Sequence, residues 1–476
     1  MSAAEWTVVS NGRIIDGTGA APRIGTVAAR GGRITAVGDF DETTGIPRGA
    51  EVSRIDATGK TVMPGLIDAH CHMTYGESRT EEEIDLYTSA EGRTLRAAWN
   101  AAKVLRAGVT SISQPGGSYF IGVGLRDAIA EGFVQGPRMA AAGRYLTTSN
   151  GLTDWYPDSV GVPDGSIGIL TNTMPQMIDE IRRQVKAGVD FIKIADSPLG
   201  EFQAFTNDEL KAVADLAHQL GRRITIHARG SAEVRAAVDA GFDWIMHGNQ
   251  MSDDTIEALA QSRIPLVPTL TLLGNSTDYG KDVGVPTGLY EAWARMLEDS
   301  ADTLHRARQA GVVFGAGTDS GFSLTPYGEW HAHELTLLAD YAGLTPMEAI
   351  QAGTRNVAVT VTAKDTLGVL VPGALADVIV VNGDPLADIT VLERRENIEV
   401  VISKGTPVVF DEESLARRWP HERVIGYSLD DLFYRPDSPR RRPVPASDLP
   451  PAVVTDEERD LASDVARREQ AARLDV

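Results

Sequence analysis

Eight short apolar segments alternate with helix-forming segments between residues 66 and 315, and this alternation restricts the fold more than any other feature. Three of the helical segments end in Ala-Gly-Val and a fourth ends in Ala-Gly-Phe. Glycine at such a position suits the left-handed cap that ends a helix, and the next strand follows at once. Eight strands that alternate with helices predict an α/β protein built on a (β/α)8 (TIM) barrel. A doubly wound parallel sheet is the competing fold.

The predicted strands are Leu66–Ala69, Val109–Ser113, Arg138–Ala142, Asp190–Ala195, Arg223–Ile226, Trp244–Met246, Ile264–Val267 and Val312–Gly315. The predicted helices between them include Glu81–Ala107, Met174–Ala187, Asn207–Leu220, Ser231–Ala240, Asp253–Gln261 and Leu289–Ala310.

The two ends of the chain do not follow this alternation. Residues 5–62 contain short strand-like runs separated by glycine turns, and residues 368–410 return to the same pattern. We expect the two ends to form one small β-sandwich domain, with parts at 1–64 and 365–410, around a barrel at 65–364. Residues 411–476 read as a C-terminal arm, proline-rich at first and then polar and helix-forming.

The composition restricts partners and location. A net charge of −21 argues against nucleic acid and anionic membranes as partners, because phosphates would be repelled. Cys71 is the only cysteine, which excludes an intramolecular disulfide and fits a reducing cytoplasm. We find no signal peptide and no apolar run long enough to span a membrane. These features predict a cytoplasmic protein that binds neither nucleic acid nor membranes.

Side chains suited to metal binding follow several of the predicted strands. The first strand leads into His70 and His72, and residues i and i+2 of an extended chain point to the same side. Two imidazoles that converge at the end of a strand are typical metal ligands. In a barrel the functional groups lie at the C-terminal ends of the strands. The other strands bring Lys193, His227, His247 and Asp319 to that rim.

The motifs around these residues resemble the metal-dependent amidohydrolase superfamily, in its imidazolonepropionase-like and prolidase-like branch. Phenylurea and molinate (thiocarbamate) hydrolases are among the relatives that the sequence resembles. The matching motifs, in chain order, are P-G-L-I-D-A-H-C-H, F-I-K-I-A, I-H-A, H-G, G-T-D-S-G, P-Y-G-E-W-H-A-H-E-L, A-G-L-T-P-M-E-A-I and G-V-L-V-P-G-A-L-A-D-V-I-V-V-N-G-D-P.

The resemblance implies one or two divalent metal ions, zinc first, with cobalt, manganese or iron as alternatives. His70 and His72 would hold one ion, with Asp319 in contact with it. His227 and His247 would hold the other, and Lys193 would bridge both as a carbamate formed with CO2. A homo-oligomer is also implied.

The resemblance and metal-hydrolase chemistry together predict hydrolysis of a carbonyl C–N bond in an amide, urea or (thio)carbamate, such as an N-aryl or N-alkyl xenobiotic. Asp319 would act as general base, and His247 or a loop tyrosine would stabilise the oxyanion. An Xaa-Pro dipeptidase or N-acyl amino acid hydrolase is the alternative. A non-catalytic assembly protein on the same scaffold is a third hypothesis.

Long loops after the third, seventh and eighth strands are expected to wall the substrate pocket. Their aromatic residues would suit an apolar substrate, or would only pack the loops onto the barrel. The candidates for substrate contact are Tyr145, Trp155, Arg229, Phe322, Tyr327, Trp330 and His331. Arg229 would bind a substrate carboxylate or pair with an acidic neighbour. His331 and His333 would lie on a helix, where residues i and i+2 point apart, so they are not a metal pair.

Overall fold

The computed structural model describes residues 5–282, 285 and 287–417. Most of the predicted C-terminal arm therefore lies outside the described residues. Its beginning contains a short helix, α13 (Glu412–Leu415).

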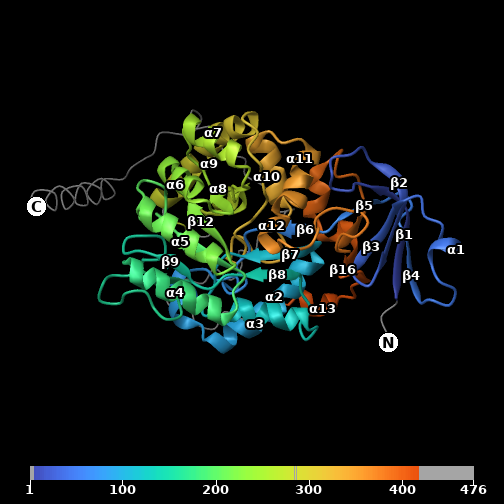
Figure 1. The fold of residues 1–476 in the computed structure, drawn as a ribbon, viewed down its shortest axis with the longest axis horizontal. Helices are drawn as coiled ribbons and strands as arrows, with labels where there is room; N and C mark the ends of the chain where they lie inside the picture. The colour runs from blue at the N-terminus through green and yellow to red at the C-terminus, as the bar shows by residue number, and fades with distance from the viewer. Residues whose placement is uncertain (1–4, 283–284, 286, 418–476) are drawn as a thin grey trace, which may run out of the picture. The chain divides into compact units, whose positions relative to one another are not determined.

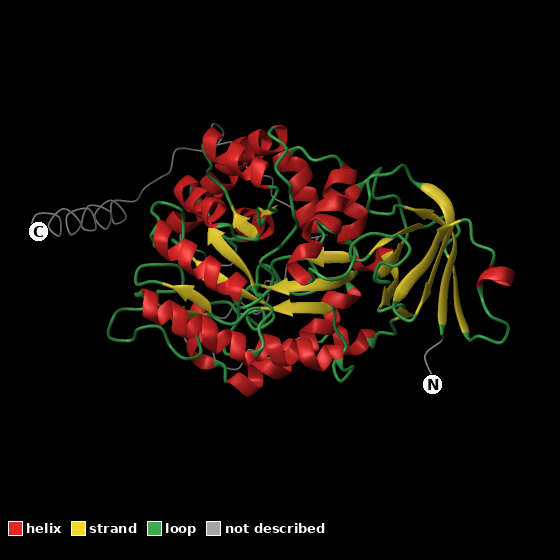
Figure 2. Cartoon of the chain, viewed as in Figure 1, coloured by secondary structure: helices red, strands yellow, loops and turns green. Residues whose placement is uncertain are grey.

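Parallel strands form the centre of the barrel (Figures 1 and 2). One parallel sheet has the order β6-β7-β8, and a second contains β11-β12-β13-β14. A backbone hydrogen bond from Asp190 N to Ala141 O (2.8 Å) joins the two sheets, and one from Ala69 N to Ala316 O (3.0 Å) joins the first strand segment to the eighth. The predicted (β/α)8 barrel is confirmed. The strands are β6 (Leu66–Asp68), β7 (Val109–Gln114), β8 (Arg138–Ala141), β11 (Phe191–Ala195), β12 (Arg223–Ala228), β13 (Trp244–His247) and β14 (Leu266–Val267).

The eighth predicted strand, Val312–Gly315, is reduced to a single β-bridge between Phe314 and Leu266. Beyond it the backbone of Gly317 runs so close to His70 that a Cβ atom on this glycine would lie 2.7 Å from the His70 Cβ. This close approach brings the Thr318–Ser320 turn against the first strand.

Helices cover the outside of the barrel strands (Figure 2). Gly188 and Gly241 end two of them with φ of 92° and 85°, the left-handed caps that the Ala-Gly steps predicted. The helices are α2 (Ala90–Arg106), α3 (Ile121–Ala130), α4 (Met174–Ala187), α5 (Asn207–Gln219), α6 (Ser231–Ala240), α7 (Asp253–Ser262), α8 (Leu270–Tyr279), α9 (Thr287–Gln309), α10 (His333–Ala342) and α11 (Pro346–Ala352).

The predicted helix Glu81–Ala107 is interrupted. A short π-helix, η1 (Glu83–Tyr87), comes first, and α2 starts only after Ser89, whose hydroxyl accepts a hydrogen bond from the Gly92 N–H. Ser and Thr favour such N-caps, so the Thr-Ser pair begins a new helix here. The predicted helix around His331 also starts later, at His333.

The segment after β8 was expected to be a long loop. It contains two further short strands, β9 (Tyr145–Thr147) and β10 (Gly168–Leu170), which extend the second sheet beside β11. Tyr145 is thereby held on a strand rather than on an irregular loop.

Both ends of the chain contribute to one mixed eight-stranded sheet, as predicted. Its order is β17-β16-β15-β5-β1-β2-β3, with β4 paired to β1. Blue strands from the beginning of the chain and red β16 lie side by side in Figure 1. The strands are β1 (Trp6–Ile14), β2 (Arg23–Arg30), β3 (Arg33–Gly38), β4 (Val52–Asp56), β5 (Thr61–Pro64), β15 (Val378–Val381), β16 (Ile398–Ser403) and β17 (Thr406–Pro407). Because β5 leads directly into β6, this sheet anchors the segment that ends at His70 and His72.

Among the described residues, no helix combines the length and apolar character that crossing a membrane would require.

Candidate metal centre and substrate cavity

The two histidines of the first strand meet at their Nε2 atoms. His70 and His72 follow β6, are both buried, and have Nε2 atoms 3.0 Å apart. Their other ring nitrogens are occupied: the Nδ1 of His72 lies 2.9 Å from the Gly116 carbonyl, and that of His70 lies 3.0 Å from the Thr269 hydroxyl. The Thr269 hydroxyl itself donates to the Val267 carbonyl. Both Nδ1 atoms are therefore the donors.

These contacts select the tautomers in which both Nε2 atoms carry lone pairs. Burial lowers the pKa of His70 well below its usual value, against the opposing effect of Asp319, so this ring is neutral. Two lone pairs that face each other at 3.0 Å repel unless a cation lies near both. The pair therefore fits a metal ion better than it fits a hydrogen bond.

His227 and His247 lie across the cavity from this pair. Their ring centroids are 4.2 Å apart, and that of His247 is 5.3 Å from the ring of His70. Burial lowers the pKa of both imidazoles well below the usual value. Both ring nitrogens of His247 are buried without a hydrogen-bond partner among the described residues. A buried polar atom with no partner is costly, and a metal ion would satisfy it.

Lys193 is buried in the middle of β11. Burial lowers the pKa of its amine to about 7, against the opposing effect of Asp319. Its Nζ lies 2.8 Å from the Met246 sulfur. At a pKa of about 7, a large share of this lysine is uncharged amine near neutral pH, which is the form that reacts with CO2.

Asp319 completes the group at the end of the eighth barrel segment. Its Oδ1 lies 3.0 Å from the His72 Nε2 and 3.4 Å from the His70 Nε2. Burial acts to raise the pKa of the carboxyl, but His70 and His72 outweigh it and keep the pKa below the usual value. Asp319 and His247 both have positive φ, 58° and 80°. Such conformations are costly for these residues and occur where a functional geometry is imposed.

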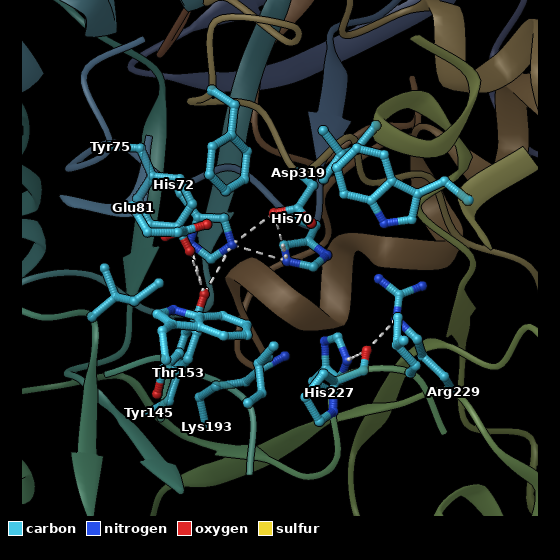
Figure 3. Close-up of a pocket in the computed structure, with 18 residues that line it drawn as sticks. His70, His72, Tyr75, Glu81, Tyr145, Thr153, Lys193, His227, Arg229 and Asp319 are labelled. Carbon is cyan, nitrogen blue, oxygen red and sulfur yellow. Dashed lines mark hydrogen bonds and ion pairs between the residues drawn. The ribbon is translucent and has the colours of Figure 1, made fainter. Parts of the chain in front are cut away.

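The donor set fits a divalent metal. Single donor atoms of His70, His247 and Asp319 all lie within 4.8 Å of one another. Neutral imidazoles, a carboxylate and an uncharged amine are the forms of these groups that bind metals. Figure 3 shows His70, His72 and Asp319 on one side of a common space, with Lys193 and His227 opposite them.

The cavity beside this centre has a volume of about 440 Å³, which suits a small molecule. Its walls are mainly apolar and aromatic, and besides Lys193 and Asp319 two further ionisable side chains, Glu81 and Arg229, face it. The lining residues are His70, His72, Tyr75, Glu81, Tyr145, Leu152, Thr153, Trp155, Ile167, Lys193, Pro198, Leu199, His227, Arg229, Leu272, Trp293, Asp319 and Phe322.

Four of the seven predicted substrate residues line this cavity: Tyr145, Trp155, Arg229 and Phe322. The other three lie behind it. The Tyr327 hydroxyl donates to the His72 carbonyl, and Trp330 is fully buried against Tyr279 and His333. The Nδ1 of His331 lies 2.7 Å from Asp68 Oδ2, which makes it a support of the metal centre rather than a cavity wall.

Sequence reasoning missed several lining residues. Tyr75 stacks on His72, with ring centroids 4.2 Å apart and planes 2° apart, and its hydroxyl lies 2.8 Å from that of Tyr145. Its position three residues after His72 was the available signal. Glu81 was hidden at the start of a predicted helix, and Trp293 lies inside α9. No spacing pattern marked either as part of the cavity.

Asp68 holds the turns that carry His70 and Asp319. Its Oδ1 accepts hydrogen bonds from the backbone N–H groups of His70 (3.0 Å) and Thr318 (3.1 Å). Its Oδ2 accepts the Thr318 hydroxyl at 2.6 Å, in addition to His331.

We expect Asp68→Ala to lower the free energy of unfolding by about 2–4 kcal/mol, because it leaves several buried donors unpaired. Urea unfolding measures this loss. The control is Asp253→Ala, which breaks an exposed pair with Arg306 and is expected to cost about 0–1 kcal/mol. A loss at Asp68 no larger than at Asp253 would contradict the role given to Asp68.

A closed (β/α)8 barrel whose strand ends present imidazoles and a carboxylate to one cavity defines the class of metal-dependent barrel hydrolases. Residues 61–408 match the amidohydrolase family. The chain belongs to this family, and its relatives place it in the imidazolonepropionase-like and prolidase-like branch, as the motifs indicated.

Ochratoxinase from Aspergillus niger is 29% identical over 382 residues, which cover 72% of this chain and 75% of that protein. Imidazolonepropionase from Geobacillus kaustophilus is 26% identical over 424 residues, 81% and 90% of the two chains. The crystal structure of a prolidase in complex with N-methylphosphonate-L-proline superposes with a TM-score of 0.76 at 26% identity, over 85% of this chain and 99% of that one. Molinate hydrolase shares the fold, with a TM-score of 0.72 at 23% identity over 89% of this chain and 100% of that one.

Proposed function

We propose that this chain hydrolyses the carbonyl C–N bond of a substrate that carries a free carboxylate, such as an N-acyl amino acid or a dipeptide. The observation that carries this proposal is the state of Arg229. It lies two residues beyond His227, lines the cavity, and is only 9% exposed.

The Arg229 guanidinium has polar neighbours but no carboxylate in direct contact among the described residues. It donates to the Asn249 Oδ1 at 2.6 Å and to the Pro198 carbonyl at 3.1 Å. The carboxylate of Glu233 accepts the backbone N–H of Arg229 instead. Among the described residues no carboxylate forms an ion pair with the guanidinium, and burial lowers the pKa of Arg229 to about 10.

A buried cation is costly unless an anion accompanies it. A substrate carboxylate would supply that charge and could form the paired hydrogen bonds that guanidinium groups favour. The prolidase relative was crystallised with N-methylphosphonate-L-proline, a ligand that carries the proline carboxylate, and this supports a carboxylate-bearing substrate.

We propose that His70, His72 and Asp319 hold one divalent metal, that His227 and His247 hold a second, and that a carbamate on Lys193 bridges them. The bound metals would lower the pKa of a water molecule and polarise the substrate carbonyl. The chain's own residues supply the remaining chemistry.

Asp319 is the proposed general base. Its carboxylate is ionised at neutral pH and can take the proton of the attacking water and pass it to the departing nitrogen. The Tyr145 hydroxyl lies 3.1 Å from the His72 Nε2, within the cavity, and together with His247 it is the candidate to stabilise the oxyanion. The aromatic walls would exclude water from the reacting groups.

We expect Arg229→Gln to lower kcat/KM for an N-acyl amino acid by about 100-fold or more, because a buried charge-assisted pair is lost. For the matching N-acyl amino acid amide, which lacks the carboxylate, the change should stay within about threefold. The control is Arg223→Gln, which removes a cation from the other end of the same strand, β12. Equal losses on both substrates would refute the assignment of Arg229.

A neutral urea or (thio)carbamate is the second candidate substrate, favoured by the aromatic wall formed by Tyr75, Tyr145, Trp155, Trp293 and Phe322. Steady hydrolysis of such a compound, unaffected by Arg229→Gln, would favour this candidate. A non-catalytic assembly role is disfavoured because every proposed metal ligand is present at the strand ends.

A further inference from the structure

Glu81 is an ionisable group of the cavity that the proposed mechanism does not use. It precedes η1, and its side chain lines the cavity together with Tyr75 and Tyr145. In Figure 3 it is drawn beside His72 and Tyr75, whereas Arg229 lies beyond His227. Among the described residues Glu81 forms no ion pair with a basic side chain.

The electrostatic surroundings of Glu81 favour a cation. Burial, together with Asp85, Asp319 and Glu82, raises the pKa of its carboxyl to about 8. Every charged neighbour that acts on it is acidic. Arg93 acts to lower the pKa of Asp85, and Asp85 does not line the cavity, so Glu81 is the carboxyl group that faces the cavity besides Asp319.

In Figure 3, Glu81 and Arg229 lie on opposite sides of the group of candidate metal ligands, with Asp319 between them. Asp319 acts on the pKa of both residues, whereas Arg229 acts on His70, His227 and His247. The cavity thus has an acidic group at one end, a guanidinium at the other, and Asp319 between them.

We propose that Glu81 is a specificity-determining residue that binds the α-ammonium group of an aminoacyl substrate whose carboxylate lies at Arg229. This inference rests on the proposed function and narrows its substrate class from N-acyl amino acids in general to zwitterionic dipeptides. The scissile carbonyl then lies between the two charged ends, beside Asp319. The ammonium group would donate a charge-assisted hydrogen bond to the Glu81 carboxylate. The surrounding carboxylates would also attract its positive charge.

The test compares two substrates that differ only in the amine. L-Alanyl-L-phenylalanine has it, and N-propanoyl-L-phenylalanine lacks it. On the metal-loaded full chain, Glu81→Gln should lower kcat/KM for the first by about 10–100-fold and leave the second within about threefold. The control is Glu82→Gln, which removes an exposed neighbouring carboxylate outside the cavity. Equal effects of Glu81→Gln on both substrates would overturn the proposal.

Binding separates this proposal from the proposed hydrolysis. Uncleavable ketomethylene analogues of the two compounds are titrated calorimetrically into wild-type and Glu81→Gln protein. A selective loss of affinity for the amine-bearing analogue supports the ammonium site even if neither substrate is cleaved. Glu81→Gln could instead lower the affinity for both analogues equally, or leave both affinities unchanged. If N-propanoyl-L-phenylalanine is nevertheless cleaved, the ammonium site is refuted while the hydrolase assignment stands.

Discussion

Asp319→Asn is expected to reduce kcat by about 10²–10⁴-fold while the protein stays folded. Asparagine keeps the size of the side chain, and its amide oxygen can still contact a metal ion, but it cannot take up a proton at neutral pH. Steady-state kinetics with the metal-loaded protein measure the loss. Circular dichroism and metal analysis establish that the variant retains its fold and a substantial part of its metal.

The control for Asp319 is another buried aspartate. Asp377 is ion-paired with Arg138, which begins β8 at the opposite end of the barrel strand from the metal centre. Asp377→Asn should reduce stability more than turnover. Near-normal turnover in Asp319→Asn would eliminate Asp319 as the general base.

Lys193→Gln is expected to reduce the metal content from two ions per chain to at most one and to lower activity at least 100-fold. Glutamine fills a similar volume but cannot form a carbamate, so the bridge between the two ligand sets is lost. Elemental analysis of the purified variant measures the metal content. Lys103→Gln is the control, because Lys103 is also buried but is paired with Glu77, and neither residue lines the cavity.

The lowered pKa of Lys193 gives this prediction a pH dependence. The pKa of this amine is about 7, so at higher pH it is mainly uncharged and reacts with CO2. At lower pH the ammonium form predominates, and this form does not react with CO2. Bicarbonate should therefore promote reconstitution of the metal-free protein with zinc at pH 8, and this effect should decline as the pH falls through 7. Full metal content in Lys193→Gln would rule out the bridging carbamate.

The sequence predicted the barrel because each part of the evidence was local. Apolar strand segments, Ala-Gly helix ends and the residues directly after strands are all readable from short stretches. The six candidate ligands followed from the rule that parallel strands of a barrel end at one rim. The structure brings all six of these side chains to that rim, as Figure 3 illustrates for five of them.

The cavity walls were harder to predict because they depend on how distant segments meet. Tyr327, Trp330 and His331 lie in the expected loop, yet they turn behind the metal centre, where Asp68 and the His72 carbonyl bind two of them. Glu81 reaches the cavity because the helix predicted at 81–107 breaks at the Ser89 cap. Such a break depends on one hydroxyl, and hydrophobic periodicity does not register it.

The cation–anion arrangement of the cavity also lay beyond sequence reasoning. Arg229 was identified by its position after His227, but pairing with an acidic neighbour was an equal alternative. Only the fold shows that Glu233 accepts the backbone N–H of Arg229 and leaves the guanidinium without a carboxylate partner among the described residues.

Elemental analysis of the purified full chain tests most directly whether this barrel holds catalytic divalent metal. It is paired with hydrolysis of N-propanoyl-L-phenylalanine, L-alanyl-L-phenylalanine and a phenylurea before and after chelation. We expect one to two divalent ions per chain, zinc first, and hydrolysis that chelation abolishes and added metal restores. Absence of stoichiometric metal, together with hydrolysis that chelation does not affect or no hydrolysis at all, would contradict it.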